Sequence, residues 1–406
     1  MKKKLLLTAA TLIISTQSFG ASGLNGDPQC HLQAPHINKK FSDSMIEIAT
    51  TAYSEGVSEA AITATLRSID QTVDVLKSDR NQQSFQRPFI DAYNRRISNG
   101  TINSARGKMN SFSSILARAE REYGVPKEVL TTFWGLETAF GTYQGNVHTI
   151  SALALLAHDC RRPHLFRPQL VAAMKLVDQG LLDPVTTTGA WAGEIGQVQM
   201  LPNDILHLGI DGDGDGKISL KTSTADAMMS AANMLKHHGW QTDQPWIKEV
   251  TVSNNAAWNE SGLSRKLSIA QWKNLGVQAR SGDLGDHNLP ASLVSPQGHK
   301  GPKFLVYENY EVFLKWNQSF TYTLSAAHMA TILQGDPKFQ DGIPDLGLTT
   351  PQVKELQRKL QTFGHDIGEV VDGLIGGKTR IAVRIEQRRL GMITDGWPTP
   401  YLLNNL

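Results

Sequence analysis

The sequence predicts a mainly α-helical fold with small β additions, an α+β arrangement. Apolar residues recur at helical spacing over most of the first 250 positions, as at Met45, Ile48 and Ala52. Alternation typical of strands is confined to residues 251–273 and 303–313. The length of 406 residues allows two or three domains, each large enough to bury its own core.

The first 20 residues have the pattern of a signal peptide. Lys2, Lys3 and Lys4 precede the apolar run 5–14, and small residues ending at Gly20 follow. The run is too short to span a bilayer. No cysteine follows it closely, since the first is Cys30, so we expect no lipid attachment and no stable membrane insertion. The sequence therefore predicts a soluble protein exported to the periplasm.

Charge and cysteine content narrow the partners and the compartment. Without the three leader lysines, 37 basic and 38 acidic residues remain, which argues against nucleic acid or a membrane surface as partner. Cys30 and Cys160 are the two cysteines of the chain. Because export means an oxidising compartment, we expect them to form a disulfide; two separate buried thiols are the alternative.

Helical patterns follow one another from residue 41 to residue 180. We expect residues 100–103 to form a break in helical structure, followed by one long helix that runs through residues 109–123. Further helices are expected at 151–160 and 168–180, after the helix described next and before a glycine-rich loop.

A carboxylate lies on the apolar face of one predicted helix. Pro126 suits the first turn, Phe133 and Trp134 share a face with Glu137, and Gly141 is expected to close the helix. Burial and the helix C-terminus should both raise the pKa of Glu137. A Glu that is protonated near neutral pH can act as a general acid. The alternative is a helix-end Glu that reaches water.

Two loops carry further candidate residues. Residues 189–202 combine glycines with Trp191, Glu194 and Gln199, so a sugar could stack on the indole and bond to the amide, although an ordinary packed turn gives the same pattern. The second loop begins at Asp211 and resembles a calcium loop in its alternating carboxylates. Its twelfth position is Thr222, which replaces the usual bidentate carboxylate ligand. A solvated Asp-Gly turn is the alternative. The expected ligands are Asp211, Asp213, Asp215 and Ser219.

The C-terminal part begins after a segment rich in Gly, Asp and Pro. Residues 336–347 predict a linker. Thr350 can then cap a helix that has Pro351 in its first turn and an apolar stripe of Val353, Leu356 and Leu360. Residues 348–406 therefore form a separate small domain in this interpretation.

Several of these segments resemble one family. Residues 134–146, 189–202, 211–215, 237–240 and 316–317 are similar, in order, to motifs of the MltB-like lytic murein transglycosylases. The resemblance implies a lysozyme-like catalytic domain over residues 27–335. It departs from the best-known branch at three positions, where Ala190 replaces Ser, and Met234 and Trp316 replace Tyr. By resemblance, Glu137 is catalytic and the substrate-binding residues are Gln199, Trp191, Glu194, Tyr322, Asn317 and Trp134.

The tail resembles the small three-helix peptidoglycan-binding domain of wall hydrolases, with Glu386 near a position where an aromatic residue is usual. Together the two resemblances imply a lytic transglycosylase that cleaves glycan strands without a cofactor, with any calcium being structural. We expect a monomer that works beside cell-wall synthesis or division proteins. Two alternatives are a lysozyme-type muramidase, with Glu194 as second carboxylate, and a non-catalytic wall-binding scaffold.

Overall fold

The structure, a computed structural model, describes residues 40–80, 87–368 and 371–406. The predicted signal peptide and Cys30 therefore lie outside the described residues. The chain divides into two compact units. Unit 1 contains Met1–Asn81, Gly145–Ile195 and Gln199–His207, and unit 2 contains Gln82–Gln144, Gly196–Val198 and Leu208–Leu406. Within the described ranges, no helix is long and apolar enough to cross a membrane.

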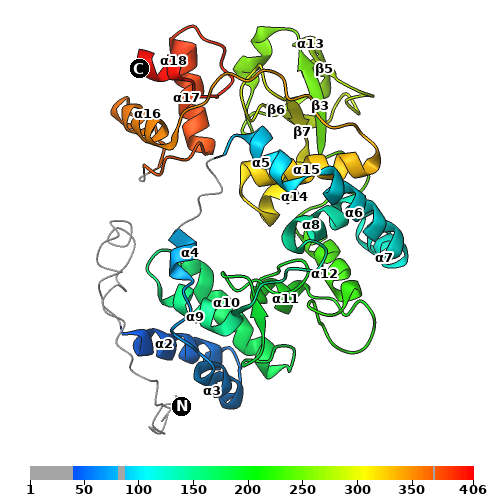
Figure 1. Cartoon of the computed structure of the whole chain (residues 1–406), viewed down its shortest axis with the longest axis vertical. Coiled ribbons are helices and arrows are strands. Elements are labelled where there is room, and N and C mark those ends of the chain that lie inside the picture. Colours follow the sequence, from blue (N-terminus) through cyan, green and yellow to red (C-terminus); the bar gives the residue numbers. More distant parts are fainter. Residues whose placement is uncertain (1–39, 81–86, 369–370) are drawn as a thin grey trace. The chain divides into compact units, whose positions relative to one another are not determined.

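Unit 1 is built around helix α9, which lies beside α10 (Figure 1). Residues 149–157 of α9 are all buried, as expected for a helix that is apolar on every side. Helix α10 packs along α9, and α2 and α3 pack against α10. The elements of unit 1 are α2 (Phe41–Ser54), α3 (Glu59–Arg67), α4 (Leu76–Arg80), β1 (Val147–His148), α9 (Thr149–His158), α10 (Pro163–Asp178), β2 (Thr188–Gly189) and α11 (Pro202–Leu208, whose last residue belongs to unit 2).

Buried ion pairs join α4 to the segment that links α9 and α10. Asp159 is 3% exposed, and its Oδ1 forms an ion pair with Arg80 Nη2 at 2.7 Å. Asp79 is 1% exposed, and its Oδ1 forms an ion pair with Arg161 Nη1 at 2.7 Å. Each buried carboxylate is thus paired with a guanidinium, without which its burial would be strongly unfavourable. Cys160 lies between these pairs in the sequence and is itself buried.

Unit 2 surrounds helix α8 with four other helices, α6, α7, α12 and α15. The sequence prediction of one long helix before α8 was wrong, because α6 ends at Ser111 and α7 begins at Ser113, with Phe112 outside helical geometry between them. Gly100 does not interrupt the chain, since Ser98 and Thr101 form a capping box that starts α6 before it. The helices here are α5 (Phe89–Arg96), α6 (Asn99–Ser111), α7 (Ser113–Tyr123), α8 (Lys127–Thr138), α12 (Thr224–His237), α14 (Glu308–Trp316) and α15 (Phe320–Gln334).

A five-stranded antiparallel sheet with the order β4-β6-β7-β3-β5 forms the β part of unit 2 (Figure 1). Trp258 and Trp272 are buried in its core. The sequence missed β5 and β6, and residues 303–313 form a strand only as far as Val306 before α14 begins. The elements are β3 (Ile247–Val252), η3 (Asn255–Glu260), β4 (Leu267–Ser268), α13 (Ile269–Asn274), β5 (Val277–Ala279), β6 (Pro290–Val294) and β7 (Phe304–Val306).

The segment predicted as a linker is extended but packed on unit 2. Phe339 is 4% exposed and its ring lies 4.8 Å from Tyr93 and 5.3 Å from Phe89, centroid to centroid. The backbone N–H of Ile343 donates to the carbonyl of Lys300 at 3.0 Å. Glycine and proline therefore end regular secondary structure in this segment, but the segment is packed and is not a flexible linker.

Three helices form the C-terminal bundle: α16 (Thr350–Thr362), α17 (Gly377–Arg389) and α18 (Pro400–Asn405). Leu356 and Leu360 of the predicted stripe are buried in its core. The helix cap is Thr349, one residue before the predicted Thr350. Glu386 is buried, accepting hydrogen bonds from His365 at 2.7 Å and Arg389 at 2.6 Å, which explains how the bundle accommodates a carboxylate.

Candidate active site and acidic loop

Helix α8 carries Glu137 in its last turn and ends in strained backbone. Pro126 is its N-cap, and Thr138 is its last helical residue. Ala139 and Phe140 then adopt left-handed φ angles of 49° and 60°, which residues with a Cβ rarely do. The predicted end at Gly141 was wrong, because the backbone already leaves the helix at Ala139.

Gly141 has a different role from the one predicted. Its N–H donates to Thr138 Oγ1 at 2.8 Å, and that hydroxyl donates to the carbonyl of Gln197 at 2.6 Å. A Cβ at Gly141 would lie 2.9 Å from Gln197 Oε1. The glycine therefore permits a close approach that fixes the end of α8 immediately after Glu137.

Glu137 receives two hydrogen bonds on the same carboxyl oxygen. Trp316 Nε1 donates to Oε1 at 2.9 Å, and Tyr322 Oη donates to Oε1 at 2.5 Å. The donors come from α14 and α15, 179 and 185 residues further along the chain. Trp316 stacks on Phe133 with centroids 4.2 Å apart and ring planes inclined by 22°, which fixes the indole in place. Both donors are on Oε1, so Oε2 is the oxygen left available to carry a proton.

The surroundings push the pKa of Glu137 in two directions. Burial raises it, whereas the hydrogen bonds from Tyr322 and Trp316 lower it, and the net direction is upward from the ordinary value. Burial, and then the charge of Glu137, hold the pKa of Tyr322 well above its ordinary value, so the phenol stays protonated and donates. Such a carboxyl can give a proton and then take one back.

Two other predicted residues of unit 2 serve the packing around this site. Trp134 is 1% exposed, with the rings of Phe112 and Phe140 edge-on to it at 5.1 and 5.6 Å. The side chain of Asn317 accepts the N–H of Ser319 at 2.9 Å in the turn from α14 to α15. Asn317 thus helps to set the positions of the helices that carry Trp316 and Tyr322.

The remaining predicted residues, Trp191, Glu194 and Gln199, belong to unit 1. A tight turn closes where the N–H of Ala190 donates to the carbonyl of Glu194 at 2.9 Å. Gln199 has a left-handed φ of 54° beside the bridge between Ile195 and Met200. Strained backbone in a residue with a Cβ is typical of binding loops, because the surrounding structure must hold it.

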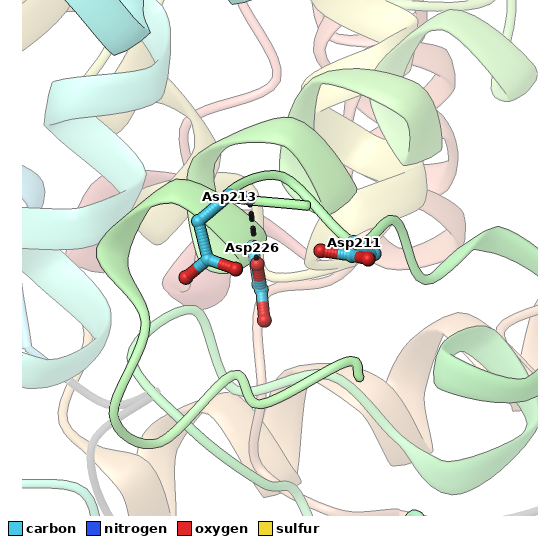
Figure 2. Close-up of side chains that lie close together, drawn as sticks. All are labelled: Asp211, Asp213 and Asp226. Atoms are coloured by element: carbon cyan, nitrogen blue, oxygen red, sulfur yellow. Dashed lines mark hydrogen bonds between the residues drawn. The ribbon is translucent and has the colours of Figure 1, made fainter. Parts of the chain in front are cut away.

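The acidic loop brings three carboxylates together. Asp211, Asp213 and Asp226 each place an oxygen within 4.8 Å of the others (Figure 2). The predicted ligand Asp215 is not one of the three, and the hydroxyl of Ser219 instead bonds to Thr222 at 2.7 Å. Oxygens that surround a calcium ion at 2.3–2.6 Å lie at most about 5 Å apart, so the cluster fits this ion.

Backbone N–H groups also point at these carboxylates. Asp211 accepts from Gly214 at 2.7 Å and Gly216 at 2.8 Å, and these bonds hold its pKa below the ordinary value. Asp226, 1% exposed, accepts from Gly212 at 2.8 Å and Ser219 at 2.7 Å. The loop is therefore held in shape by hydrogen bonds of its own.

Sequence reasoning missed Asp226 and underrated Trp316. Asp226 stands in the first turn of α12, three residues after the cap Ser223, where an acidic residue usually reads as a helix-start signal. The sequence placed Trp316 in a family motif and as a replacement for Tyr, without a role of its own. Its indole N–H supplies a hydrogen-bond donor, as a Tyr hydroxyl would.

A carboxyl with a raised pKa in a mainly α-helical fold defines a candidate acid–base site, and the comparisons with known proteins give the family. Residues 40–331 match the transglycosylase SLT domain, and residues 349–406 match the peptidoglycan binding domain. The chain belongs to the transglycosylase SLT domain family. It is also 28% identical over 243 residues to membrane-bound lytic murein transglycosylase B of Escherichia coli K12, a match covering 59% of this chain and 64% of that protein.

Solved structures agree with this assignment and confirm the lysozyme-like, mainly α fold. SltB3 from Pseudomonas aeruginosa in complex with NAG-anhNAM-pentapeptide superposes with a TM-score of 0.82 at 32% identity, covering 91% of this chain and 99% of that one. The complex of SltB3 with NAG-NAM-pentapeptide superposes with a TM-score of 0.83, covering 91% of this chain and 100% of that one. Escherichia coli Slt35 in complex with calcium shares the fold, with a TM-score of 0.64 at 23% identity over 74% and 95%.

Proposed function

We propose that the protein is a peptidoglycan lytic transglycosylase that cleaves the β-1,4 bond between N-acetylmuramic acid and N-acetylglucosamine. The observation that carries the proposal is the carboxyl of Glu137, whose Oε1 is held by Trp316 and Tyr322 and whose pKa is raised. Family membership and the peptide-bearing glycans bound to SltB3 support the choice of substrate.

In the first step Glu137 Oε2 gives its proton to the glycosidic oxygen as the bond from this oxygen to C1 of N-acetylmuramic acid breaks. The leaving strand departs with a free hydroxyl. The substrate's own acetamido group stabilises the positive charge that develops at C1. The two donors on Oε1 stabilise the carboxylate that remains, because hydrogen bonds to a charged acceptor are the strong ones.

In the second step the carboxylate of Glu137 takes the proton of the C6 hydroxyl, and O6 bonds to C1. A 1,6-anhydro ring closes, the proton returns to Glu137, and no water is consumed. A single residue that acts first as acid and then as base needs a pKa that is raised but moderate, and burial opposed by two hydrogen bonds gives that balance.

The other elements have supporting roles in this proposal. Trp191, Glu194, Gln199 and Tyr322 contact the glycan strand, on the strength of the family resemblance. Asp211, Asp213 and Asp226 hold a structural calcium ion that takes no part in the chemistry; a calcium-bound relative of the same fold supports this. Residues 27–335 form the catalytic domain, residues 336–347 connect it, and residues 348–406 bind the wall.

The protein acts in the periplasm as a monomer after loss of residues 1–20, with Cys30 and Cys160 joined by a disulfide. The N-terminal residue of the exported chain tests the leader. Its intact mass after alkylation, with and without prior reduction, tests the disulfide: two added alkyl groups only after reduction support it, and two without reduction exclude it. Sedimentation of the exported chain tests the monomer.

Mass spectrometry of the muropeptides released from purified sacculi tests the reaction itself. Products that are one water lighter than hydrolytic ones, and that borohydride does not reduce, are the expected result. Reducible products of full mass would make the protein a muramidase and point to a second carboxylate such as Glu194. Sacculus binding without any release would leave only the wall-binding scaffold.

A further inference from the structure

A hollow of about 860 Å³ lies at the beginning of α8 in unit 2. Its lining comes from the end of α7, the segment between α12 and β3, the beginning of β3, the loop 283–285 and the end of α15 (Figure 1). Pro126, the N-cap of α8, lines it, whereas Glu137 stands near the other end of this helix, about 16 Å away along the axis. The hollow is large enough to hold several side chains of a ligand.

Strand β3 leaves part of its edge unpaired at this hollow. The N–H of Tyr307 donates to the carbonyl of Trp246 at 3.0 Å, which is the first bond between β7 and the β3 segment. Because antiparallel strands bond through alternate residues, the N–H and C=O of Ile247 point to the opposite side, toward β5. The pairing with β5 stops at the bond from the N–H of Arg280 to the carbonyl of Glu249, at 3.0 Å. Ile247 therefore has no strand partner on that side.

These unpaired groups are buried. Ile247 is 4% exposed and lines the hollow. Gln244 also lines it, and its Oε1 is buried without a hydrogen-bond partner among the described residues. Buried donors and acceptors are nearly always paired in folded proteins. One main-chain N–H, one main-chain carbonyl and one side-chain acceptor are thus left for water or for a ligand.

A buried amide fixes the loop that precedes β3. Asn309 is 0% exposed and donates through Nδ2 to the carbonyls of Gln241 at 2.8 Å and Gln244 at 2.9 Å. Its Oδ1 accepts the N–H of Gln241 at 2.8 Å. Asp243, between these residues, has a left-handed φ of 61°. The carboxylate of Asp243 is therefore placed at the hollow by backbone that the surrounding structure must hold.

Carboxylates outnumber basic side chains in the lining by five to three. Asp336 pairs with Lys248 at 3.2 Å. Glu120 and Asp243, by contrast, have no ion-pair partner within 4 Å among the described residues. The other two basic residues of the lining have exposed side chains: Arg121 and Lys236.

Glu120 responds to the acids around it. Burial, and then the charge of Glu128, raise the pKa of Glu120, and the charge of Asp243 adds to the rise. Lys127 opposes this effect, but the net direction is upward. Because like charges disfavour the ionised form, a cation beside Glu120 and Asp243 would be stabilised by both carboxylates.

We propose that this hollow docks an extended segment of a partner protein that carries a lysine or an arginine. The main chain of such a segment offers an acceptor and a donor to Ile247, as when a peptide adds a strand to the edge of a sheet. Its cationic side chain lies beside Asp243 and Glu120, and its apolar side chains lie against Trp246. A small diamine would use the carboxylates and leave Ile247 unpaired.

Calorimetry at low ionic strength, with the full exported chain, tests the proposal. The probe is a pentapeptide of alternating valine and lysine with both ends blocked. Three comparison ligands are the same peptide with glutamate in place of lysine, the same peptide with esters in place of its amides, and 1,5-diaminopentane. Asp243→Asn is the test variant, since asparagine tolerates a left-handed φ. Asp91→Asn is the matched control, an exposed carboxylate of α5 outside the lining.

We expect the valine–lysine peptide to bind about tenfold more tightly than each comparison ligand. Asp243→Asn should weaken its binding about threefold to tenfold, and Asp91→Asn by less than about twofold, at equal Tm. Hydrogen exchange at the N–H of Ile247 should slow when the peptide binds. The proposal is wrong if millimolar peptide does not bind, if the glutamate or ester peptide binds equally well, or if both variants lose the same affinity. Diaminopentane that binds as tightly as the peptide would show a site for small cations instead.

The docking site and the proposed function fail separately. Asp243→Asn should release anhydro products at the wild-type rate, because Glu137, Trp316 and Tyr322 are not in the lining. A chain that releases no anhydro product and still binds the valine–lysine peptide would overturn the proposed reaction and support the docking site.

Discussion

Glu137 and Asp211 are two carboxylates of unit 2 with opposite pKa shifts. Glu137 accepts one indole N–H and one phenol O–H on the same oxygen, and burial raises its pKa in spite of them. Asp211 accepts backbone N–H groups on both oxygens, from Gly214 and Gly216 among others, and its pKa falls.

The difference shows what separates a carboxyl that transfers protons from one that holds a cation. Backbone donors on both oxygens, near solvent, keep a carboxylate ionised. Side-chain donors on one oxygen, together with burial, leave the other oxygen able to carry a proton. The same functional group therefore serves acid–base chemistry at the end of α8 and, as proposed, calcium binding in the acidic loop.

The largest expected effect comes from removing the acid. Glu137→Gln should lower the release of anhydromuropeptides by about 10²–10⁴-fold, because a positioned general acid contributes that much. Sacculus binding, measured by co-sedimentation, should stay within about twofold. Glu311→Gln, an exposed change on α14, is the control. Activity retained in Glu137→Gln would remove this residue from the mechanism.

Tyr322→Phe should have the next largest effect. Losing a hydrogen bond to a charged acceptor is worth about 1.5–3 kcal/mol, so kcat/KM should fall by roughly 10–100-fold. Since this bond lowers the pKa of Glu137, its loss raises that pKa, and the fall of activity at alkaline pH should move to higher pH. A profile unmoved, or moved to lower pH, would contradict this. Tyr143→Phe, at a side chain 75% exposed, is the control.

Trp316 allows a paired test of donor against ring. Trp316→Phe keeps a ring that can stack on Phe133 but loses the donor, so we expect activity to fall about 3–10-fold. Trp316→Tyr keeps a ring and offers a hydroxyl, so its activity should be closer to the wild-type value. Initial rates of anhydro product release measure both variants. Equal rates would show that residue 316 contributes to activity through ring packing and not through a hydrogen bond.

The acidic loop should make the thermal stability of the protein depend on calcium. A ligand at about 100 times its Kd stabilises the folded state by about 2.7 kcal/mol, so calcium should raise Tm measurably. Asp226→Asn should abolish most of this shift, whereas Asp215→Asn, outside the cluster, should keep it. Differential scanning calorimetry with calcium and with chelator measures both. The proposed ligand set is wrong if Asp215→Asn has the larger effect.

The smallest expected effect is a gain in stability. The pKa of Glu137 is raised on folding, so the folded chain binds this proton more tightly, and stability declines as pH rises past the ordinary Glu value of about 4.3. Glu137→Gln avoids that loss. Its Tm should exceed the wild-type Tm by about 1–3 °C at neutral pH and by nothing below about pH 4. A difference independent of pH would point to packing.

Sequence alone was enough to predict several features of this chain. The mainly helical fold follows from apolar periodicity, since a helix must bury one face, as Leu356 and Leu360 do, whereas the three helices of the tail were expected from the family resemblance. Glu137 stands out as a carboxylate on such a face, and the family resemblance then favoured a catalytic residue over a helix-end Glu that reaches water. These signals are local, or repeat at short spacing, and so can be read without knowing what packs against them.

Tertiary structure alone decided the rest. Trp316 and Tyr322 converge on one oxygen of Glu137 from helices almost 180 residues away, and no local pattern records that convergence. Asp226 joins Asp211 only because α12 folds back on the loop. The early end of α8 at Thr138 likewise depends on its neighbours, because close contacts such as that of Gly141 with Gln197 set the backbone there. Periodicity tells which face is buried, whereas packing decides what that face meets.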